Sequence, residues 1–432
     1  MSFLTFFVHI LYRMNDSPGL DHEWQQWNTT LELKRKIDEF YLPNPRLKNE
    51  IRNILERWII ASFNDHLVSS ESSQIPFPLW HSRNQHDIVL GEDSQFVIKM
   101  KQEFTEKNIT NYQSLIDKWR DLILTDSLRY LSEVVPQKIS SLVRPSENEI
   151  IIHTSKSRLK LKKTGPQQFH CCLELQDKKE NMHRISLRTS VVEAFVKNAQ
   201  TNPLLSDKYL ADEVLIIAAN QLTILALRYE ALSCGSQHWG LSPKHAQFVY
   251  DTFKVRNIGF ASAFNFQLYG QGATTHFCGL FPDIEKNVGC LGRWQDQKWL
   301  LHQPLLHGNW FLNPPWIEKA YLLPLMYSLI EQFMEREQNP SCTGNDLIVI
   351  VYVPNWVDAQ FMTLLTTHPI LVKYTVLDLI LLKQTYSIMT ATGDIIRASM
   401  NSRYFVFHLT SDPLSSKQLS PVFVHKLKES LL

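Results

Sequence analysis

The sequence predicts a two-domain protein of the α/β class, and three patterns of apolar residues lead to this prediction. Apolar residues recur at helical spacing over residues 20–65 and again over 95–133. Within 149–187, short β-branched or alternating segments stand between turn residues, which is typical of a small antiparallel sheet. Further along, strand-length apolar runs alternate with helical stretches, which indicates a mostly parallel sheet. We therefore expect a helical and mixed N-terminal domain, residues 1–245, and an α/β domain, residues 246–432.

Composition and charge narrow the classes of protein to which the chain can belong. Of its 432 residues, 44% are hydrophobic and 20% are charged, which is the balance of a folded protein rather than a disordered one. The net charge is only +1, so contact with a nucleic acid has to come from a local basic group. The six cysteines show no Cys-x-x-Cys spacing, so we expect neither a structural metal nor a disulfide scaffold.

The sequence favours neither export nor insertion into a membrane. Met1 to Tyr12 is apolar but lacks basic residues at its start, and Arg13 follows where a signal peptide would have small residues. No stretch approaches the roughly 20 apolar residues of a spanning helix, so we expect no membrane partner.

Each domain has its own set of expected elements. In the N-terminal domain, we expect strands at 149–153, 158–162, 169–175 and 183–187, and helices at 190–199 and 209–232. In the α/β domain, we expect a helix over 316–336, strands at 258–263, 277–280, 309–312 and 347–353, and a late hairpin formed by 384–391 and 403–409. The hairpin would end the parallel sheet with antiparallel strands.

The tetrapeptide Asn313-Pro314-Pro315-Trp316 is the strongest chemical signal in the chain. It follows the expected strand 309–312 and precedes a helix, so it stands at the carboxyl end of a strand, where open α/β sheets bind ligands. The carboxamide oxygen of Asn313 and the carbonyl oxygen of Pro314 can accept the two protons of an adenine amine and aim its lone pair at a methyl donor. The two prolines stiffen the backbone and remove competing N–H donors.

Trp316 completes the chemistry that this turn predicts. Its indole offers a flat face on which a base can stack, worth roughly 1–3 kcal/mol per base. The turn therefore predicts methylation of an amine with S-adenosylmethionine as the methyl donor. The plainer interpretation is a proline-rich turn that ends a strand, with Trp316 in the core.

The donor side of the predicted site lacks a glycine-rich loop. Ala261 and Ser262 have small side chains that let a ligand approach the backbone, and Asn265 can bond to the methionine part of S-adenosylmethionine. About twenty residues further on, Asp283 stands where an acid would bond to the ribose hydroxyls, with Glu285 close behind. Asp283 can equally be a turn residue after a proline.

A further polar turn, Asn355-Trp356, follows the expected strand 347–353. If this strand lies beside the catalytic strand, both side chains can meet the substrate. The alternative is a capped strand end with Trp356 in the core.

Five segments of the α/β domain carry a resemblance to a known family: Phe260-Ala-Ser-Ala-Phe-Asn265, Phe281-Pro-Asp283, Gly289 to Gly292, Asn313-Pro-Pro-Trp316 with Glu318, and Val353-Pro-Asn-Trp356. Together they resemble the cap-specific adenosine N6-methyltransferase family, also called the phosphorylated CTD-interacting factor 1 family. The resemblance covers the α/β domain clearly and the region before it more loosely.

The resemblance implies a Rossmann-like S-adenosylmethionine-dependent methyltransferase domain that forms a basic cap groove with a helical domain before it. The implied reaction is methylation of N6 on the 2′-O-methyladenosine next to the cap of mRNA, in the nucleus or else in the cytoplasm. By position, Asn313 to Trp316 would be catalytic and next to the donor, Glu318 would touch the substrate, and the 354–358 turn would lie on the cap side.

Two departures from the family pattern bear on these expectations. The family's tetrapeptide usually ends in Phe, whereas this chain has Trp316, so the size of the base pocket can differ. Its animal members carry an N-terminal WW domain that binds the phosphorylated tail of RNA polymerase II. Here Trp24 and Trp27 fit a helical pattern instead, so we do not expect binding to that tail.

Basic residues that could grip RNA phosphates gather between Lys156 and Lys163. Strand alternation puts Lys156, Arg158, Lys160 and Lys162 on one face, and we favour a solvated edge strand as their explanation. Arg293, in the α/β domain, is another candidate.

Two alternatives to a cap-specific enzyme stay open at this point. The same turn could methylate an adenine in DNA or inside an RNA, or the amide of a glutamine side chain. The chain could also be a catalytically silent relative that binds RNA or the cap, because its donor turn is unusual.

Overall fold

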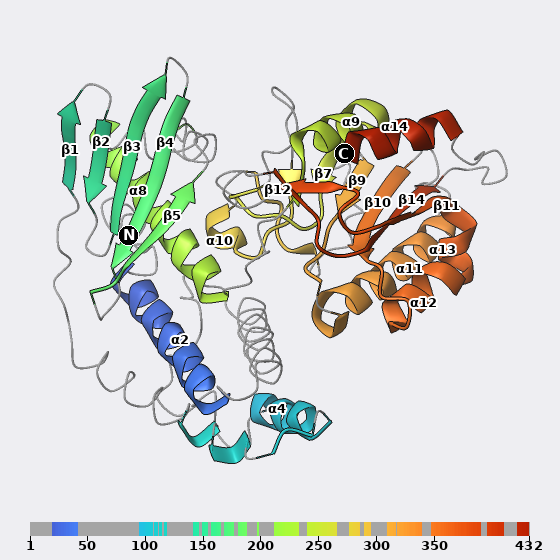
Figure 1. The fold of residues 1–432 in the computed structure, drawn as a ribbon, viewed down its shortest axis with the longest axis horizontal. Helices are drawn as coiled ribbons and strands as arrows, with labels where there is room; N and C mark the ends of the chain where they lie inside the picture. Colours follow the sequence, from blue (N-terminus) through green and yellow to red (C-terminus); the bar gives the residue numbers. More distant parts are fainter. Residues whose placement is uncertain are drawn as a thin grey trace, which may run out of the picture. The chain divides into compact units, whose positions relative to one another are not determined.

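The structure is a computed structural model of the chain. It describes residues 20–41, 95–106, 108–110, 112–114, 116–118, 141–146, 149–153, 157–165, 168–176, 180–187, 197, 211–232, 240–265, 276–285, 289–294, 309–316, 318–338, 347–389, 395–409 and 421–431. The chain divides into two compact units: the first comprises Met1–Ser186 and Ala199–Cys234, and the second comprises Leu187–Asn198 and Gly235–Leu432. Figure 1 shows the elements of both.

The first unit contains a five-stranded sheet whose strands lie in chain order. They are β1 Ser141–Ser146, β2 Glu149–His153, β3 Ser157–Gly165, β4 Gln168–Gln176 and β5 Met182–Leu187. β1 to β4 pair antiparallel, which confirms the small antiparallel sheet and adds β1 to it. The prediction of a basic edge strand is wrong, because β3 is the central strand of the five.

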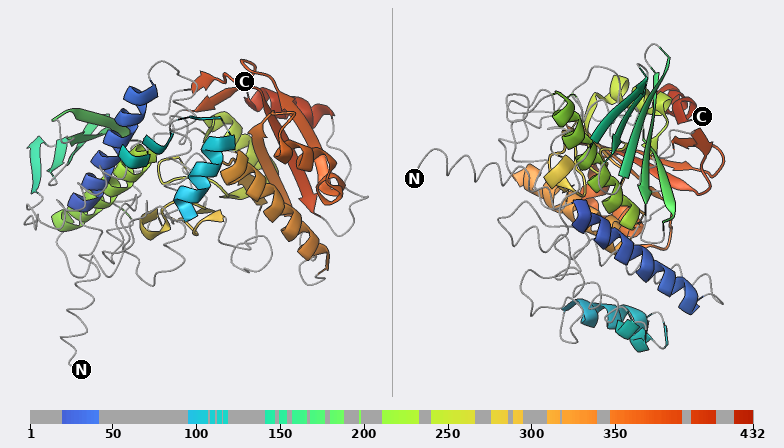
Figure 2. Two further views of the ribbon diagram at one scale, coloured as in Figure 1. Left: turned by 90° about the horizontal axis from the view of Figure 1, so that it is seen from below. Right: turned by 90° about the vertical axis from the view of Figure 1, so that its left-hand side faces the viewer.

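Helices cover one face of this sheet (Figures 1 and 2). α2 Leu20–Tyr41 packs along α8 Ala211–Leu232, and α8 also contacts β1 and β2. A fully buried ion pair joins the two helices, with 2.7 Å between Arg228 Nη2 and Glu23 Oε1. Burying one such charge without its partner would cost several kcal/mol, roughly 3–5, so this pair fixes how the helices meet. A third helix, α4 Gln95–Glu106, belongs to the same unit.

One segment of α8 contradicts the prediction that no stretch approaches a membrane span. By length and composition alone, Glu213–Leu232 could cross a membrane. Most of it is buried inside the unit, and it carries Arg228 of the buried ion pair. It is packed as a core helix. Met1 to Tyr12 and the second part of the helical pattern over residues 20–65, from residue 42 onward, lie outside the described residues.

The second unit is built on a six-stranded sheet. In spatial order its strands are β11 Thr375–Leu381, β14 Ser402–Leu409, β10 Leu347–Pro354, β9 Asn309–Leu312, β7 Val255–Ile258 and β8 His276–Phe277. β10, β9, β7 and β8 run parallel, whereas β14 is antiparallel to both β10 and β11. The strand predicted at 347–353 therefore lies beside the strand predicted at 309–312, as expected.

The late hairpin and the first strand of this unit differ from the prediction. β14 inserts between β10 and β11 rather than pairing with 384–391. β12 Ser387–Met389 pairs instead with β13 Ile395–Arg397 and with β6 Gly240–Leu241 in a separate sheet. The strand predicted at 258–263 is β7, which ends at Ile258, so most of that segment is a turn.

The strand order reverses between β9 and β7, near the β8 edge of the six-stranded sheet. From β7 the chain adds β8 on one side and then returns to add β9 on the other side. Because the carboxyl ends of parallel strands meet at one edge, the turns after β7, β8, β9 and β10 all lie at the same edge. Open α/β sheets bind ligands where the order reverses, which here is between β7 and β9.

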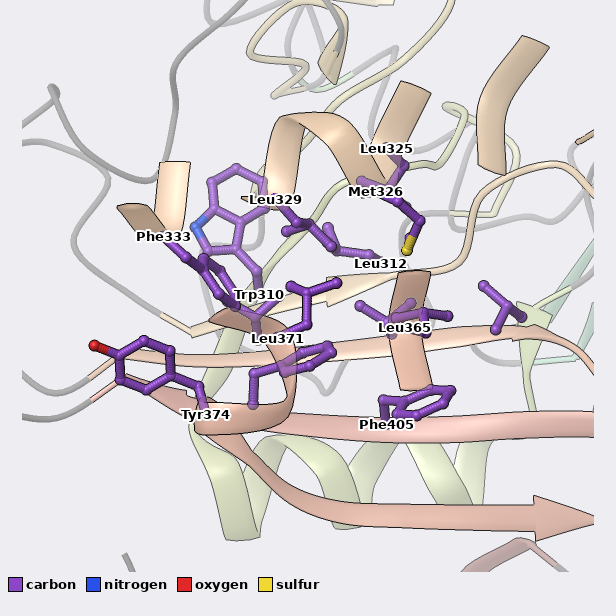
Figure 3. Close-up of a cluster of buried hydrophobic side chains, with 14 of the residues drawn as sticks. Trp310, Leu312, Leu325, Met326, Leu329, Phe333, Leu365, Leu371, Tyr374 and Phe405 are labelled. Carbon is purple, nitrogen blue, oxygen red and sulfur yellow. The ribbon is translucent and has the colours of Figure 1, made fainter. Parts of the chain in front are cut away.

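Helices cover both faces of this sheet (Figure 1). One face carries α9 Pro243–Phe253 and α14 Pro421–Leu431, and the other carries α11 Leu323–Gln338, α12 Gln360–Thr367 and α13 Pro369–Tyr374. Under α11 and α13, the side chains of Trp310, Leu312 and Phe405 point into one apolar cluster (Figure 3). This packing fixes β9, and with it the position of the turn that follows.

The predicted helix over 316–336 is confirmed, with an irregular first turn. It begins as a π-helical turn, η5 Glu318–Leu322, and continues as α11. Pro324 explains the wide turn, because proline has no N–H to donate and its ring collides with the carbonyl four residues before it.

Candidate active site at the carboxyl edge of the second sheet

Gly259 brings the turn after β7 against the end of β9. Its N–H donates to the carbonyl oxygen of Phe311 at 2.9 Å. A Cβ on Gly259 would lie 2.2 Å from Cδ2 of Leu312, closer than real atoms come. Only glycine therefore allows the two strand ends to approach at this point.

The turn from Ala261 to Asn265 is held by its own side chains. Asn265 Oδ1 accepts from the N–H of Ser262 at 2.8 Å, and Ser262 Oγ accepts from the N–H of Phe264 at 3.2 Å. Ser262 and Asn265 are buried, whereas Ala261 is half-buried and donates its N–H to the carbonyl oxygen of Cys278 at 3.0 Å. The oxygen of Asn265 is thus engaged in the turn, while its Nδ2 makes no hydrogen bond within the described residues.

Glu285 ties this turn to the one after β8. It lies in the short helix α10 Pro282–Glu285 and is fully buried. Its Oε1 accepts from the N–H of Ala263 at 2.8 Å, and its Oε2 accepts from the N–H of Phe281 at 3.0 Å. A Cβ on Gly279 would lie 2.1 Å from Oε2, so glycine leaves the room that the carboxylate occupies.

The acid that the sequence singled out on the donor side was Asp283, and the acid with a visible structural role is Glu285. The backbone of Asp283 lies in α10, but its side chain lies outside the described part of the structure. The contact of Asp283 with the ribose therefore stays a prediction. Spacing alone cannot separate two acids two residues apart, because either can follow the same strand.

The tetrapeptide after β9 reaches the surface of the unit. Pro314 is buried, while Asn313, Pro315 and Trp316 are half-buried. The carboxamide of Asn313 makes no hydrogen bond to any residue that the structure describes. The Trp316 ring lies 5.8 Å from that of Tyr352, tilted by 49°. One edge of Trp316 is thus supported while part of it remains accessible, which disagrees with a fully buried core tryptophan.

Glu318 joins the turn after β9 to the turn after β10. Its Oε1 accepts from the N–H of Gln360 at 2.8 Å and lies 3.5 Å from that of Phe361, the first two residues of α12. The residue before the helix, Ala359, makes no side-chain cap. Glu318 therefore supplies the cap from another element, where a carboxylate also meets the positive end of the helix dipole.

The turn after β10 presents one buried amide oxygen and one exposed indole. Asn355 donates its N–H to the carbonyl oxygen of Asn401 at 3.1 Å, but its buried Oδ1 has no hydrogen-bond partner among the described residues. Trp356 is 36% exposed and packs edge-on against Phe361 at 5.9 Å. The alternative interpretation, a core tryptophan at this position, is wrong, because Trp356 is available for contact.

The chemistry of this edge comes from neutral hydrogen-bonding groups rather than from a strong acid or base. Burial, together with the neighbouring Tyr386, raises the pKa of Tyr352 well above its usual value, so this hydroxyl stays protonated. Over the described ranges, no three His, Cys, Asp or Glu side chains are placed to share a metal ion. These residues can bind a ligand, stack on it and accept hydrogen bonds at amide and carbonyl oxygens.

The comparison with protein families bears directly on these residues. The family model described as the phosphorylated CTD interacting factor 1 WW domain matches residues 206–381. The match covers less than half of the chain, so the chain resembles the phosphorylated CTD interacting factor 1 family over this region. The match to this family spans β7, β8, β9 and β10, and so it includes all four turns at the carboxyl edge. No curated protein matches the chain.

The match to this family model agrees with the resemblance found in the sequence. Within the matched region, the hydrogen bonds that involve Gly259, Glu285 and Glu318 link the four turns in series along the sheet. Sequence reasoning placed Asn313 and Asn355 on neighbouring turns but missed the linking role of Glu285 and Glu318. Their partners are backbone N–H groups, and a backbone partner leaves no signal in the sequence.

Proposed function

We propose that this protein is an S-adenosylmethionine-dependent methyltransferase that methylates N6 of adenosine in RNA. The observation that carries the proposal is the position of Asn313-Pro314-Pro315-Trp316 at the carboxyl end of β9, beside the reversal in strand order. The strand order and the antiparallel β14 support a Rossmann-like methyltransferase fold for the second unit.

The residues at this edge fit the proposed cofactor. Asn313 and the Nδ2 of Asn265 have hydrogen-bonding capacity that no described residue uses, and Asn355 Oδ1 is buried without a partner. Groups of this kind hold the amino acid and nucleoside parts of a ligand. We assign donor binding to Ala261, Ser262, Asn265, Asp283 and Asn313. When bound there, S-adenosylmethionine supplies an electrophilic methyl group.

The chain's own part in the reaction is to position an amine. The Asn313 oxygen and the Pro314 carbonyl oxygen would accept hydrogen bonds from the two N–H groups of N6, which turns the nitrogen lone pair away from the purine ring. Neither Pro314 nor Pro315 has an N–H that would compete for these oxygens. The accessible face of Trp316, supported from behind by Tyr352, holds the base by stacking.

The substrate that we propose is the 2′-O-methyladenosine next to the cap of mRNA. The support is the match to the family model together with the exposed Trp356 on the turn after β10, which offers a second stacking surface beside the turn that carries Trp316. Glu318 and Asn355 would complete this side of the site. Binding to the phosphorylated polymerase tail, which the family name mentions, is not part of the proposal. We place the protein in the nucleus, where capped RNA is made.

Transfer of a labelled methyl group tests this function. Wild-type protein is incubated with labelled S-adenosylmethionine and RNA that carries a cap and a first 2′-O-methyladenosine, and the nucleosides are separated by mass spectrometry. We expect N6-methylation of the first adenosine. Equal methylation of DNA or internal RNA adenines would move the substrate away from the cap, and no methylation of any adenine would refute the proposal.

One observation favours a second function, that of a catalytically silent RNA-binding relative. The N–H groups of Ser262 and Ala263 would be natural donors to a bound ligand, but they already serve Asn265 and Glu285. Calorimetry with S-adenosylhomocysteine separates the two functions. A measurable heat of binding supports the enzyme, and its absence together with retained RNA binding supports the silent relative.

A further inference from the structure

The five-stranded sheet of the first unit has two faces of opposite character. Alternate residues on one face are fully or almost fully buried: Ile152, Leu159, Leu173 and Leu175. Residues between them point to the other face, and the register pairs Arg158 with Glu174 and Lys160 with Cys172. One face therefore belongs to the core and the other carries charge.

Three cations surround a single carboxylate on the charged face. Glu174, on β4, lies 3.4 Å from Arg158 Nε, 3.4 Å from Lys160 Nζ and 3.3 Å from Arg184 Nε. Within the described residues, no other carboxylate lies within ion-pair distance of these three side chains. One negative charge against three positive charges leaves a local excess of two, in a chain whose total net charge is +1.

These cations retain hydrogen-bonding capacity toward a ligand. The distances to Glu174 are longer than the roughly 2.7–2.9 Å of a strong charge-assisted hydrogen bond, so each pair is loose. The side chain of Arg184 is 72% exposed and that of Arg158 is 41% exposed, whereas that of Glu174 is only 8% exposed. Around Glu174, the charge that solvent meets is therefore positive.

We propose that Arg158, Lys160 and Arg184 form a docking surface for the phosphodiester backbone of single-stranded RNA. The inference rests on the proposed function, since an enzyme that acts on the first nucleotide of an mRNA also meets the chain that follows. Arg158 and Lys160, two residues apart on β3, have backbones roughly 7 Å apart, and Arg184 on β5 lies two strands away, roughly 10 Å across the sheet. An array of this kind suits regularly spaced phosphates better than one phosphorylated side chain.

Opposite changes of charge test the surface. The double variant Lys160→Gln/Arg184→Gln leaves Arg158 to neutralise Glu174, and Glu174→Gln removes the one negative charge. For a long uncapped RNA, the slope of log affinity against log salt should become shallower by about 1.4 in the first variant and steeper by about 0.7 in the second. Loss of a purely structural ion pair would not strengthen the salt dependence.

A matched control and a short substrate complete the experiment. Lys426→Gln/Lys428→Gln removes two charges from exposed positions on α14 and should leave the salt slope unchanged. Methylation of a capped trinucleotide should be equal in all variants, because none of the changed residues belongs to the proposed active site. If the wild-type protein methylates no RNA but the variants still show these changes in salt slope, the docking surface is supported and the proposed function is refuted. An equally shallow salt slope in the control variant would overturn the inference, and so would binding of a phosphorylated peptide in place of RNA.

Discussion

Asn313 is a half-buried amide whose hydrogen-bonding groups no described residue uses, and this sets it apart from most amides in the unit. Asn265 and Asn309, by contrast, each hold a neighbouring backbone group in place. A carboxamide without an internal role adds little to stability, so its effect on activity can be separated from its effect on folding. This separation makes Asn313 the best residue at which to test the site.

We predict that Asn313→Ala lowers kcat for adenosine methylation by roughly 100-fold or more, the usual loss when one preorganised polar group is removed from an active site. The free energy of unfolding should change by less than about 0.5 kcal/mol, because no described hydrogen bond is lost. Kinetics and urea denaturation on the same preparation measure both. Unchanged kcat with normal stability would remove Asn313 from the mechanism.

Glu285 has the opposite character, because both of its oxygens hold backbone N–H groups. In Glu285→Gln an amide N–H₂ would face one of these donors, and we expect a loss of about 1–3 kcal/mol in the free energy of unfolding. Glu429→Gln, at an exposed position, is the control and should be neutral. A stable Glu285→Gln protein that no longer binds S-adenosylhomocysteine would instead show that Glu285 faces the donor.

The residues of the site were predictable to different degrees. Asn313 was found because two prolines and an aromatic residue mark its turn in the sequence. Glu285 was not separated from Asp283, because its role depends on the space left by Gly279 and on the return of the chain beside β8. Such a role exists only once two turns are brought together.

At the scale of elements, the most informative contact is the cap that Glu318 places on α12. The cap joins η5, which follows the catalytic turn, to the helix that follows the turn of Asn355 and Trp356. The resemblance implied a contact between Glu318 and substrate, whereas the structure shows one oxygen of Glu318 used for capping. The two roles predict different results for two substitutions.

We expect Glu318→Ala to destabilise the second unit by about 1 kcal/mol, the typical cost of a lost helix cap. Glu318→Gln keeps a capping oxygen and should restore most of that stability and most of the activity. Thermal unfolding and the KM for capped RNA are measured for both variants. If the glutamine variant is as stable as wild type but shows a large rise in KM, the carboxylate contacts the substrate.

Elements with strong apolar patterns were predicted well, and those that depend on strand order were not. β9, β10 and α8 were placed within two residues, because each is a continuous apolar run or a long helix. The sequence predicts an edge strand for β3 and half of a hairpin for β14, and both predictions are wrong. The alternation of residues shows which face of a sheet a residue occupies but not which strand lies next to it.

For the molecule as a whole, buried pairs of polar side chains hold distant segments together in both units. In the first unit, Arg228 meets Glu23, which lies 205 positions away in the sequence. In the second, Nδ1 of His245 on α9 lies 2.7 Å from Oγ of Ser430 on α14. Contacts of this kind are set by the complete fold, so neither was predictable from local patterns.

The docking of α14 depends on a neutral histidine. The hydroxyl of Ser430 donates to the carbonyl oxygen of Leu427 at 2.6 Å, so its oxygen accepts from Nδ1–H of His245. Nε2 is then unprotonated, and it is buried without a hydrogen-bond partner among the described residues. Burial lowers the pKa of His245 to about 3, because a charged imidazolium would lose its hydration there.

We predict that the second unit loses stability in acid through this residue. Between pH 6.5 and 3 the unfolded chain binds a proton at His245 and the folded chain does not, so the free energy of unfolding falls as the pH drops, by about 1 kcal/mol per unit. Above pH 6.5 both states are neutral and this contribution is constant. Urea denaturation of the wild type and of His245→Gln at pH 7.5 and pH 5 measures the effect. The variant should be less stable at pH 7.5, but its free energy of unfolding should fall less between pH 7.5 and pH 5. An equal fall in both proteins would exclude His245 as the source of the acid sensitivity.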